Sequence, residues 1–107
     1  MPLSAATTHI LLALAGGELH GYGIKLEIAR QSGGRYRPGP GTLYDNIDRL
    51  TNDGLIEEVK RRAAGDDPRR RYYRITPDGR RLLAVEVERL DSVVRLAKRQ
   101  LARGSAA

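Results

Sequence analysis

The segment PGPGTLYDNIDRLTNDGLIEE, from Pro38 to Glu58, contains the pattern on which the predicted fold depends. Leu43, Ile47 and Leu50 recur at the i, i+4, i+7 spacing of one helical face, and Gly54 provides a C-terminal stop. The prolines and glycines at the start of the segment predict a linker, because proline lacks a backbone donor and restricts the chain. The segment therefore predicts a short helix that follows a linker and precedes an extended stretch.

The predicted helix is acidic, although the chain of 107 residues has a formal net charge of +6. The positive charge is concentrated between Lys60 and Arg81, where nine basic residues stand against three acidic ones. The rest of the chain holds equal numbers of basic and acidic residues. An arginine-rich segment interrupted by tyrosines is typical of a surface that contacts a polyanion, and the alternative is a solvated loop.

Two further helices are expected before the linker. The first runs from Ser4 to Ala15, with Ser4, Thr7 or Thr8 as its N-cap, because apolar residues recur there at spacings of three and four. The second covers YGIKLEIARQS, residues 22–32, which is rich in good helix formers and ends at a pair of glycines. Residues 35–40 (RYRPGP) then form the linker.

A β-hairpin is expected after the acidic helix. Residues 55–62 (LIEEVKRR) predict one strand, and residues 71–75 (RYYRI) predict the returning strand, with Tyr73 and Ile75 on one face. The intervening AAGDDP has the glycine, aspartates and proline of a turn. The tip of this hairpin would carry the arginine cluster.

The last predicted helix is the longest. Thr76 as N-cap, Pro77 at the first helical position and Asp78 in the first turn mark its start, and it is expected to reach about Arg103. Its apolar residues keep a heptad spacing and offer more surface than one small core covers. We therefore prefer pairing of two copies to packing against the first helix. The expected dimerisation residues are Leu83, Val87, Leu90, Val94, Ala97 and Leu101.

The order of three helices, a hairpin and a further helix is that of a winged helix-turn-helix. The predicted fold class is therefore mainly α with a small β-hairpin: a winged helix-turn-helix followed by a long C-terminal dimerisation helix. We expect residues 1–76 to form the DNA-binding domain, residues 77–103 the dimerisation helix and residues 104–107 a disordered tail.

Three blocks of the chain resemble the successive signatures of the PadR family of bacterial transcriptional regulators: HGYGIKLEI (20–28), GTLYDNIDRLTNDGLIE (41–57) and RRRYYRITPDGRRLL (69–83). The resemblance implies a winged-helix dimer, commonly a repressor, which small and often aromatic effectors release from DNA. The chain resembles the short subfamily with a single C-terminal helix. It differs at Asp45, where many members have proline, and it lacks the Trp with which some members sandwich flat aromatic drugs.

The expected function is that of a dimeric, sequence-specific DNA-binding transcriptional regulator, a repressor released by a small-molecule effector. Its partners would be double-stranded DNA with a pseudo-palindromic operator, a second copy of the chain and a small aromatic effector. The acidic helix would discriminate bases, and the arginine-rich hairpin would hold the DNA backbone. The predicted DNA-binding residues are Arg35, Arg37, Thr42, Tyr44, Asp45, Arg49, Arg61, Arg62, Arg69, Arg70 and Arg71.

Structural roles are the alternatives for several of these residues. Tyr44 is expected either to pack beside the core or to contact a phosphate, and Asp45 can pair with Arg49 at i, i+4. For His20 a structural hydrogen bond is favoured over catalysis or metal binding. The alternatives for the whole chain are a winged-helix module that binds another protein and a non-specific DNA-binding protein.

Composition excludes several other classes of protein. There is no Cys, which excludes disulfides and thiolate metal sites, and the two histidines are isolated, so we expect no metal and no cofactor. No nucleophile and base, paired carboxylates or phosphate loop stand out, so an enzyme is not expected. The apolar run at residues 10–15 is too short to span a membrane and lacks the basic flank of a signal peptide, so we expect a cytoplasmic protein.

Overall fold

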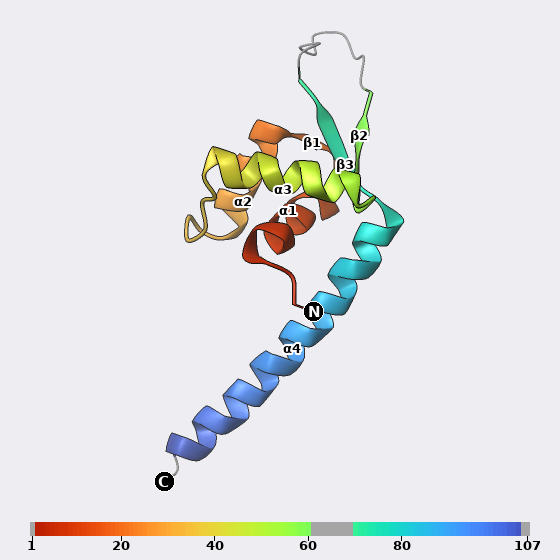
Figure 1. Ribbon diagram of the computed structural model, residues 1–107. Coiled ribbons are helices and arrows are strands. Elements are labelled where there is room, and N and C mark those ends of the chain that lie inside the picture. Colours follow the sequence, from red (N-terminus) through yellow and green to blue (C-terminus); the bar gives the residue numbers. More distant parts are fainter. Residues whose placement is uncertain (1, 61–69, 106–107) are drawn as a thin grey trace.

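The computed structural model describes residues 2–60 and 70–105, which form a small helical body from which one long helix projects (Figure 1). A short hairpin extends from the opposite end of the body. This arrangement confirms the predicted fold class of a mainly helical winged helix-turn-helix followed by a long C-terminal helix, whereas the pairing of that helix stays a prediction. In chain order the elements are α1 (Ala5–Ala15), β1 (Leu19–His20), α2 (Gly21–Gln31), α3 (Pro40–Asn52), β2 (Ile56–Val59), β3 (Tyr72–Ile75) and α4 (Pro77–Ser105).

The core lies among α1, α2, α3 and the sheet. Leu43, Ile47 and Leu50 are all buried, which confirms the apolar face predicted for α3. Asn46 is buried beside them, and its Nδ2 donates to the Thr42 carbonyl oxygen at 2.7 Å. The largest fully buried side chains are Ile10, Leu11, Leu14, Ile24, Ile28, Leu43, Ile47 and Ile56.

Side-chain caps mark the starts of three helices. Ser4 Oγ accepts from the Thr7 N–H at 3.1 Å, so Ser4 is the N-cap of α1 among the three expected candidates. Thr76 Oγ1 accepts from the Gly79 N–H at 3.0 Å, which confirms the predicted start of α4. His20 caps α2, whereas α3 starts without a side-chain cap and has Pro40 in its first turn.

The sheet has three antiparallel strands in the order β1-β3-β2. Tyr73 pairs with Leu19 of β1 on one side and with Glu58 of β2 on the other. Tyr73 and Ile75 are buried, as predicted for one face of β3. The strand β1 was not predicted, since two residues are too short to show a period.

Both hairpin strands are shorter than expected. Strand β2 ends at Val59 instead of residue 62, and β3 begins at Tyr72 instead of residue 71. The predicted turn lies outside the described residues. The described part of the hairpin therefore contains its base but not the expected arginine-rich tip.

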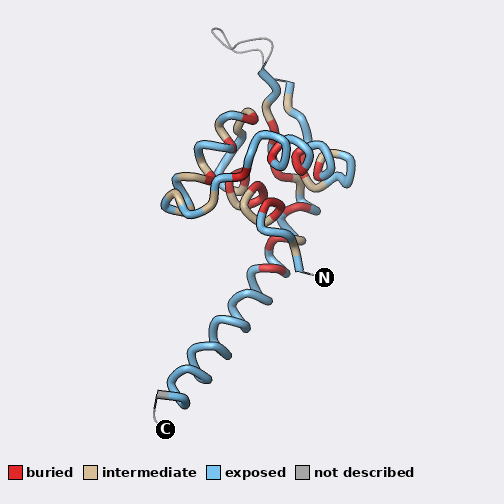
Figure 2. The backbone as a smooth tube through the Cα atoms, turned by 60° about the vertical axis from the view of Figure 1, so that its left-hand side comes forward, coloured by how far each residue is buried: buried red, intermediate tan, exposed pale blue. Residues whose placement is uncertain are grey.

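Among the residues that the structure describes, the long helix α4 contacts the body through its first turns. Leu83 packs in the core, and the buried carboxylate of Glu86 accepts from the Leu3 N–H at 3.2 Å. After Glu86 every residue of α4 through Gly104 is exposed, as the colour of the tube in Figure 2 shows. The helix ends at Ser105, so Gly104 and Ser105 belong to it and not to the expected tail.

Two glycines are required by this packing. Gly54, which follows α3, has a φ of 74°, in the left-handed region that glycine adopts without strain. At Gly79 a Cβ atom would overlap the carbonyl oxygen of Leu55. The first turn of α4 can therefore approach Leu55, in the segment between α3 and β2, only because residue 79 has no side chain.

Candidate nucleic-acid interface

The outward face of α3 carries the residues predicted to read bases. Thr42, Asp45 and Arg49 are all exposed, and so is Asp48 beside them, because the helix buries the opposite stripe. The ion pair expected between Asp45 and Arg49 is not among those that the described residues form. In the free protein the carboxylate and the guanidinium are thus separately accessible to a partner.

The connection between α2 and α3 holds the predicted pair Arg35 and Arg37, and both side chains are exposed. Between them, Tyr36 stacks on His9 of α1 with ring centroids 4.7 Å apart. The Tyr36 N–H also donates to Ser32 Oγ at 3.1 Å. These contacts hold the backbone of the connection, so its two arginines are displayed from an ordered segment.

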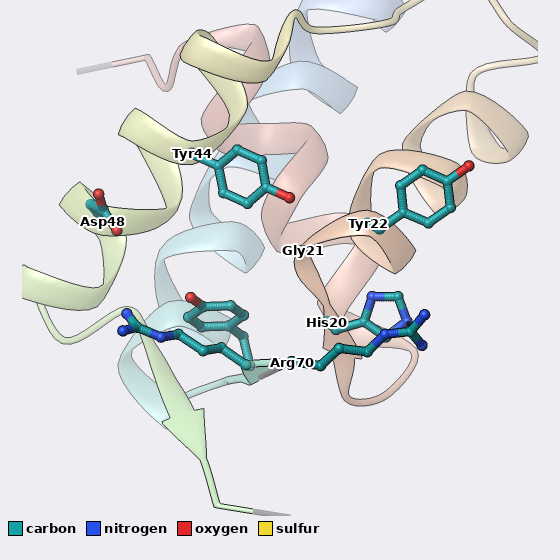
Figure 3. A pocket seen from close by; sticks show the side chains of 8 residues that line it. His20, Gly21, Tyr22, Tyr44, Asp48 and Arg70 are labelled. Carbon is teal, nitrogen blue, oxygen red and sulfur yellow. Dashed lines mark hydrogen bonds between the residues drawn. The ribbon is translucent and has the colours of Figure 1, made fainter. Parts of the chain in front are cut away.

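A cleft of about 360 Å³ lies where α2, α3 and β3 meet (Figure 3). Its walls come from the start of α2, the exposed face of α3 and the residues at the base of the hairpin. It brings the predicted residues Tyr44, Arg70 and Arg71 together with others that were not predicted as site residues. The lining consists of His20, Gly21, Tyr22, Tyr44, Asp48, Arg70, Arg71 and Tyr73.

His20 has the structural hydrogen bond that was predicted for it. Its Nδ1 accepts from the Gly23 N–H at 3.0 Å and so caps α2. The other ring nitrogen, Nε2, lies 3.3 Å from Nη1 of Arg70, and the ring meets Tyr72 edge to face. Burial, and next the positive charge of Arg70, lower the pKa of His20, so the imidazole is neutral at pH 7.

Two roles were expected for Tyr44, packing beside the core or contact with a phosphate, and the structure bears on the first. Its ring packs against the backbone of Gly21, where a Cβ atom would come within 2.7 Å of Tyr44 Cε1. The side chain is nevertheless 47% exposed and lines the cleft. Packing is therefore confirmed as one role, whereas a phosphate contact stays a prediction.

The arginines of the hairpin differ in their surroundings. Arg71 lies 4.0 Å from Glu58, and Arg74 forms an ion pair with Glu57. Both pairs are exposed and contribute little to stability. The predicted residues Arg61, Arg62 and Arg69 lie outside the described residues. Arg70 and Arg71 are therefore the hairpin arginines that the structure places at the cleft.

Sequence reasoning missed the contribution of α2 to this site. All three residues of the segment HGY, residues 20–22, line the cleft. Asp48 also lines it, although it was not among the predicted site residues. The signal that could have found His20, Gly21 and Tyr22 was the first resemblance block, which begins at His20, and Asp48 lies in the second block.

Other kinds of site find no support in the described part of the chain. Within residues 2–60 and 70–105, no group of three or more His, Asp or Glu side chains is arranged to hold a metal ion. None of the helices described combines the length and the apolar character needed to cross a membrane.

Residues 10–85 match the transcriptional regulator PadR-like family. The chain belongs to this family. It is 38% identical over 92 residues to the transcriptional regulator Rv3488 of Mycobacterium tuberculosis, with 86% of this chain and 81% of that protein covered. The family consists of transcriptional regulators and not of enzymes.

Solved structures show the same fold. A transcriptional regulator from Clostridium thermocellum superposes with a TM-score of 0.75 and 28% identity, covering 91% of this chain and 96% of that one. The PadR protein of Bacillus subtilis, solved in complex with operator DNA, gives a TM-score of 0.67 at 24% identity. That likeness covers 78% of this chain and 47% of the Bacillus protein, and it concerns the fold.

Proposed function

We propose that this PadR-like regulator is a cytoplasmic homodimer that binds a pseudo-palindromic operator and represses transcription. The observation that carries the proposal is the junction of α2, α3 and β3. There Tyr44 and Asp48 of α3 border one cleft with two hairpin arginines, whereas Thr42, Asp45 and Arg49 lie on α3 outside its lining. The Bacillus subtilis PadR protein, which was solved with operator DNA, shares this fold.

The exposed face of α3 would discriminate bases. Its Thr42, Asp45 and Arg49 match base edges in kind, since a carboxylate accepts from the cytosine amino group and arginine donates to guanine. Arg35, Arg37, Arg70 and Arg71 would contact the backbone, together with Arg61, Arg62 and Arg69, which lie outside the described residues. Affinity would thus come mainly from the arginines and specificity from α3.

Dimerisation would use the α4 seam, by which we mean Leu83, Val87, Leu90, Val94, Ala97 and Leu101. Leu83 is buried within the chain, whereas Val87, Leu90, Val94 and Leu101 are exposed large apolar residues at heptad spacing. An exposed apolar stripe of this length is typical of a helix that pairs with a partner helix. A two-fold dimer would also match the symmetry of a palindromic operator.

We also propose that a small aromatic effector releases the protein from DNA, and this part of the proposal rests on the family resemblance. The chain has no Trp and no Phe, so an aromatic effector would have to stack on its five tyrosines or its histidines. A thermal-shift screen of aromatic acids and amines on the protein, with and without duplex, tests this part. An effector should stabilise the free protein and weaken duplex binding. A ligand that does neither is not an effector.

The experiment that tests the proposed function is selection from a random duplex library at low salt. We expect enrichment of a two-fold symmetric site bound with a Kd of about 10 nM or tighter. Affinity should fall steeply with salt, because each phosphate neutralised releases counterions. A library without any enriched site would contradict sequence-specific binding. Salt-dependent binding without enrichment would instead establish the non-specific alternative.

A protein-interaction module is the second candidate, and the acidity of α3 favours it. Asp45, Asp48 and Asp53 are exposed and would repel a DNA groove unless they meet base amino groups. The test is chemical crosslinking and pull-down from cell extract. A stoichiometric protein partner that contacts α3, together with no salt-dependent retention of DNA, would support this candidate over the first.

A further inference from the structure

One end of the cleft brings two hydrogen-bond donors into contact. The Gly23 N–H donates to His20 Nδ1 at 3.0 Å, so the neutral imidazole carries its proton on Nε2. Nε2 lies 3.3 Å from Nη1 of Arg70, and a guanidinium nitrogen is also only a donor. This contact supplies neither N–H group with an acceptor. An oxygen with negative charge beside them would accept from both and would offset the guanidinium charge.

The surroundings of this pair favour an anion. The first N–H groups of a helix have no acceptor within the helix, and the pair lies at the start of α2. The Tyr44 hydroxyl lies beside this start, since a Cβ on Gly21 would come within 2.9 Å of it. Figure 3 shows Tyr44 directed toward Gly21 and shows His20 and Arg70 next to each other.

The cleft is polarised along its length. Asp48 projects from α3, on the side of the cleft away from His20 and Arg70 (Figure 3). Its carboxylate would repel an anion at its own end and leave the other end favourable. The two guanidinium groups in the lining outnumber this single carboxylate.

We propose that the His20 and Arg70 end of the cleft seats one phosphate group of the DNA backbone, with the Tyr44 hydroxyl as a third donor. This inference rests on the proposed function, which makes DNA the source of the phosphate. His20 then has two tasks: Nδ1 caps α2, and the Nε2–H donates to the phosphate. Because one ring performs both, the seat and the start of α2 are positioned together.

The chain offers an internal control for a test by NMR, because it has only two histidines. His9 stacks on Tyr36 and does not line the cleft. The Hε1 signals of both rings are followed as a function of pH in the intact protein, alone, with inorganic phosphate at constant ionic strength and with a mixed-sequence duplex. Anisotropy of the labelled duplex reports binding in the same sample.

The proposal predicts that the bound duplex raises the pKa of His20 and shifts the Hε1 signal of His20 more than that of His9, because a phosphate bound beside His20 stabilises its imidazolium. If the duplex binds and the pKa of His20 does not change, the phosphate site at His20 and Arg70 is refuted while the proposed function stands. If inorganic phosphate raises the pKa of His20 and the bound duplex does not, the site binds free phosphate and its assignment to the DNA backbone is wrong. If the duplex does not bind at all, the proposed function itself fails.

Substitutions give a second readout. His20→Asn keeps an N-cap acceptor and removes the Nε2–H, and Arg70→Ala removes the guanidinium. Each should weaken binding of the mixed-sequence duplex about five- to tenfold. The double variant should lose less than the product of the two, because both groups serve one phosphate. Arg95→Ala on the exposed part of α4 is the matched control and should bind normally. Independent, multiplicative losses would refute a shared phosphate.

Discussion

Truncating two residues of the α4 seam should dissociate the proposed dimer. Leu90 and Val94 are 39% and 48% exposed in the single chain. Complete burial of such a side chain contributes about 1.5–3 kcal/mol, so covering the exposed part contributes roughly 0.6–1.4 kcal/mol per residue. A symmetric dimer has four such side chains. The variant with Leu90→Ala and Val94→Ala should therefore lose roughly 2.5–5.5 kcal/mol of dimerisation free energy, which raises the Kd of the dimer about 70- to 10,000-fold.

The assay is sedimentation equilibrium over a range of protein concentrations, with circular dichroism to confirm that the helices persist. Val85→Ala is the matched control, because Val85 is 69% exposed on α4 and lies off the seam. It should leave the dimer Kd almost unchanged. If the native chain sediments as a monomer at every concentration, or if both variants weaken the dimer equally, pairing through the seam is refuted.

Three further predictions concern stability. Thr76→Ala removes the α4 cap and should cost about 1 kcal/mol in thermal unfolding, whereas Thr76→Ser should restore most of it. Gly79→Ala should cost more than the cap because the methyl group would overlap Leu55, whereas Gly104→Ala, with open space around it, should stabilise slightly; equal effects would refute the close approach. Because the pKa of His20 is lowered in the folded state, neutral His20 adds fully to the free energy of unfolding above about pH 6.5, and this addition is lost as the pH falls through the folded-state pKa. His20→Asn should therefore make the free energy of unfolding, measured in urea, depend less on pH between about pH 7 and 5.

Much of the fold could be predicted because the patterns are local. Leu43, Ile47 and Leu50 form the buried stripe of α3, and Thr76 caps α4 as expected. Each of these features depends on residues within one or two helical turns. A regular spacing or a cap motif therefore carries enough information to predict it.

The site was predicted less completely because it depends on contacts between distant segments. The strand β1 forms only by pairing with β3, and this pairing brings His20 next to Arg70, 50 positions later in the chain. The role of Gly21 depends on the Tyr44 ring above it. No periodicity within one segment encodes such contacts, so α2 was missed as part of the interface.

In the proposed complex α3 discriminates bases, and the arginines at the hairpin contact the DNA backbone. The most direct test is library selection carried out in parallel on the native chain, on Asp45→Ala with Arg49→Ala, and on Arg70→Ala. We predict that the α3 variant selects a changed or relaxed motif, whereas Arg70→Ala selects the native motif with lower affinity and a salt slope reduced by about one. An unchanged motif for the α3 variant, or a changed motif for Arg70→Ala alone, would contradict this account.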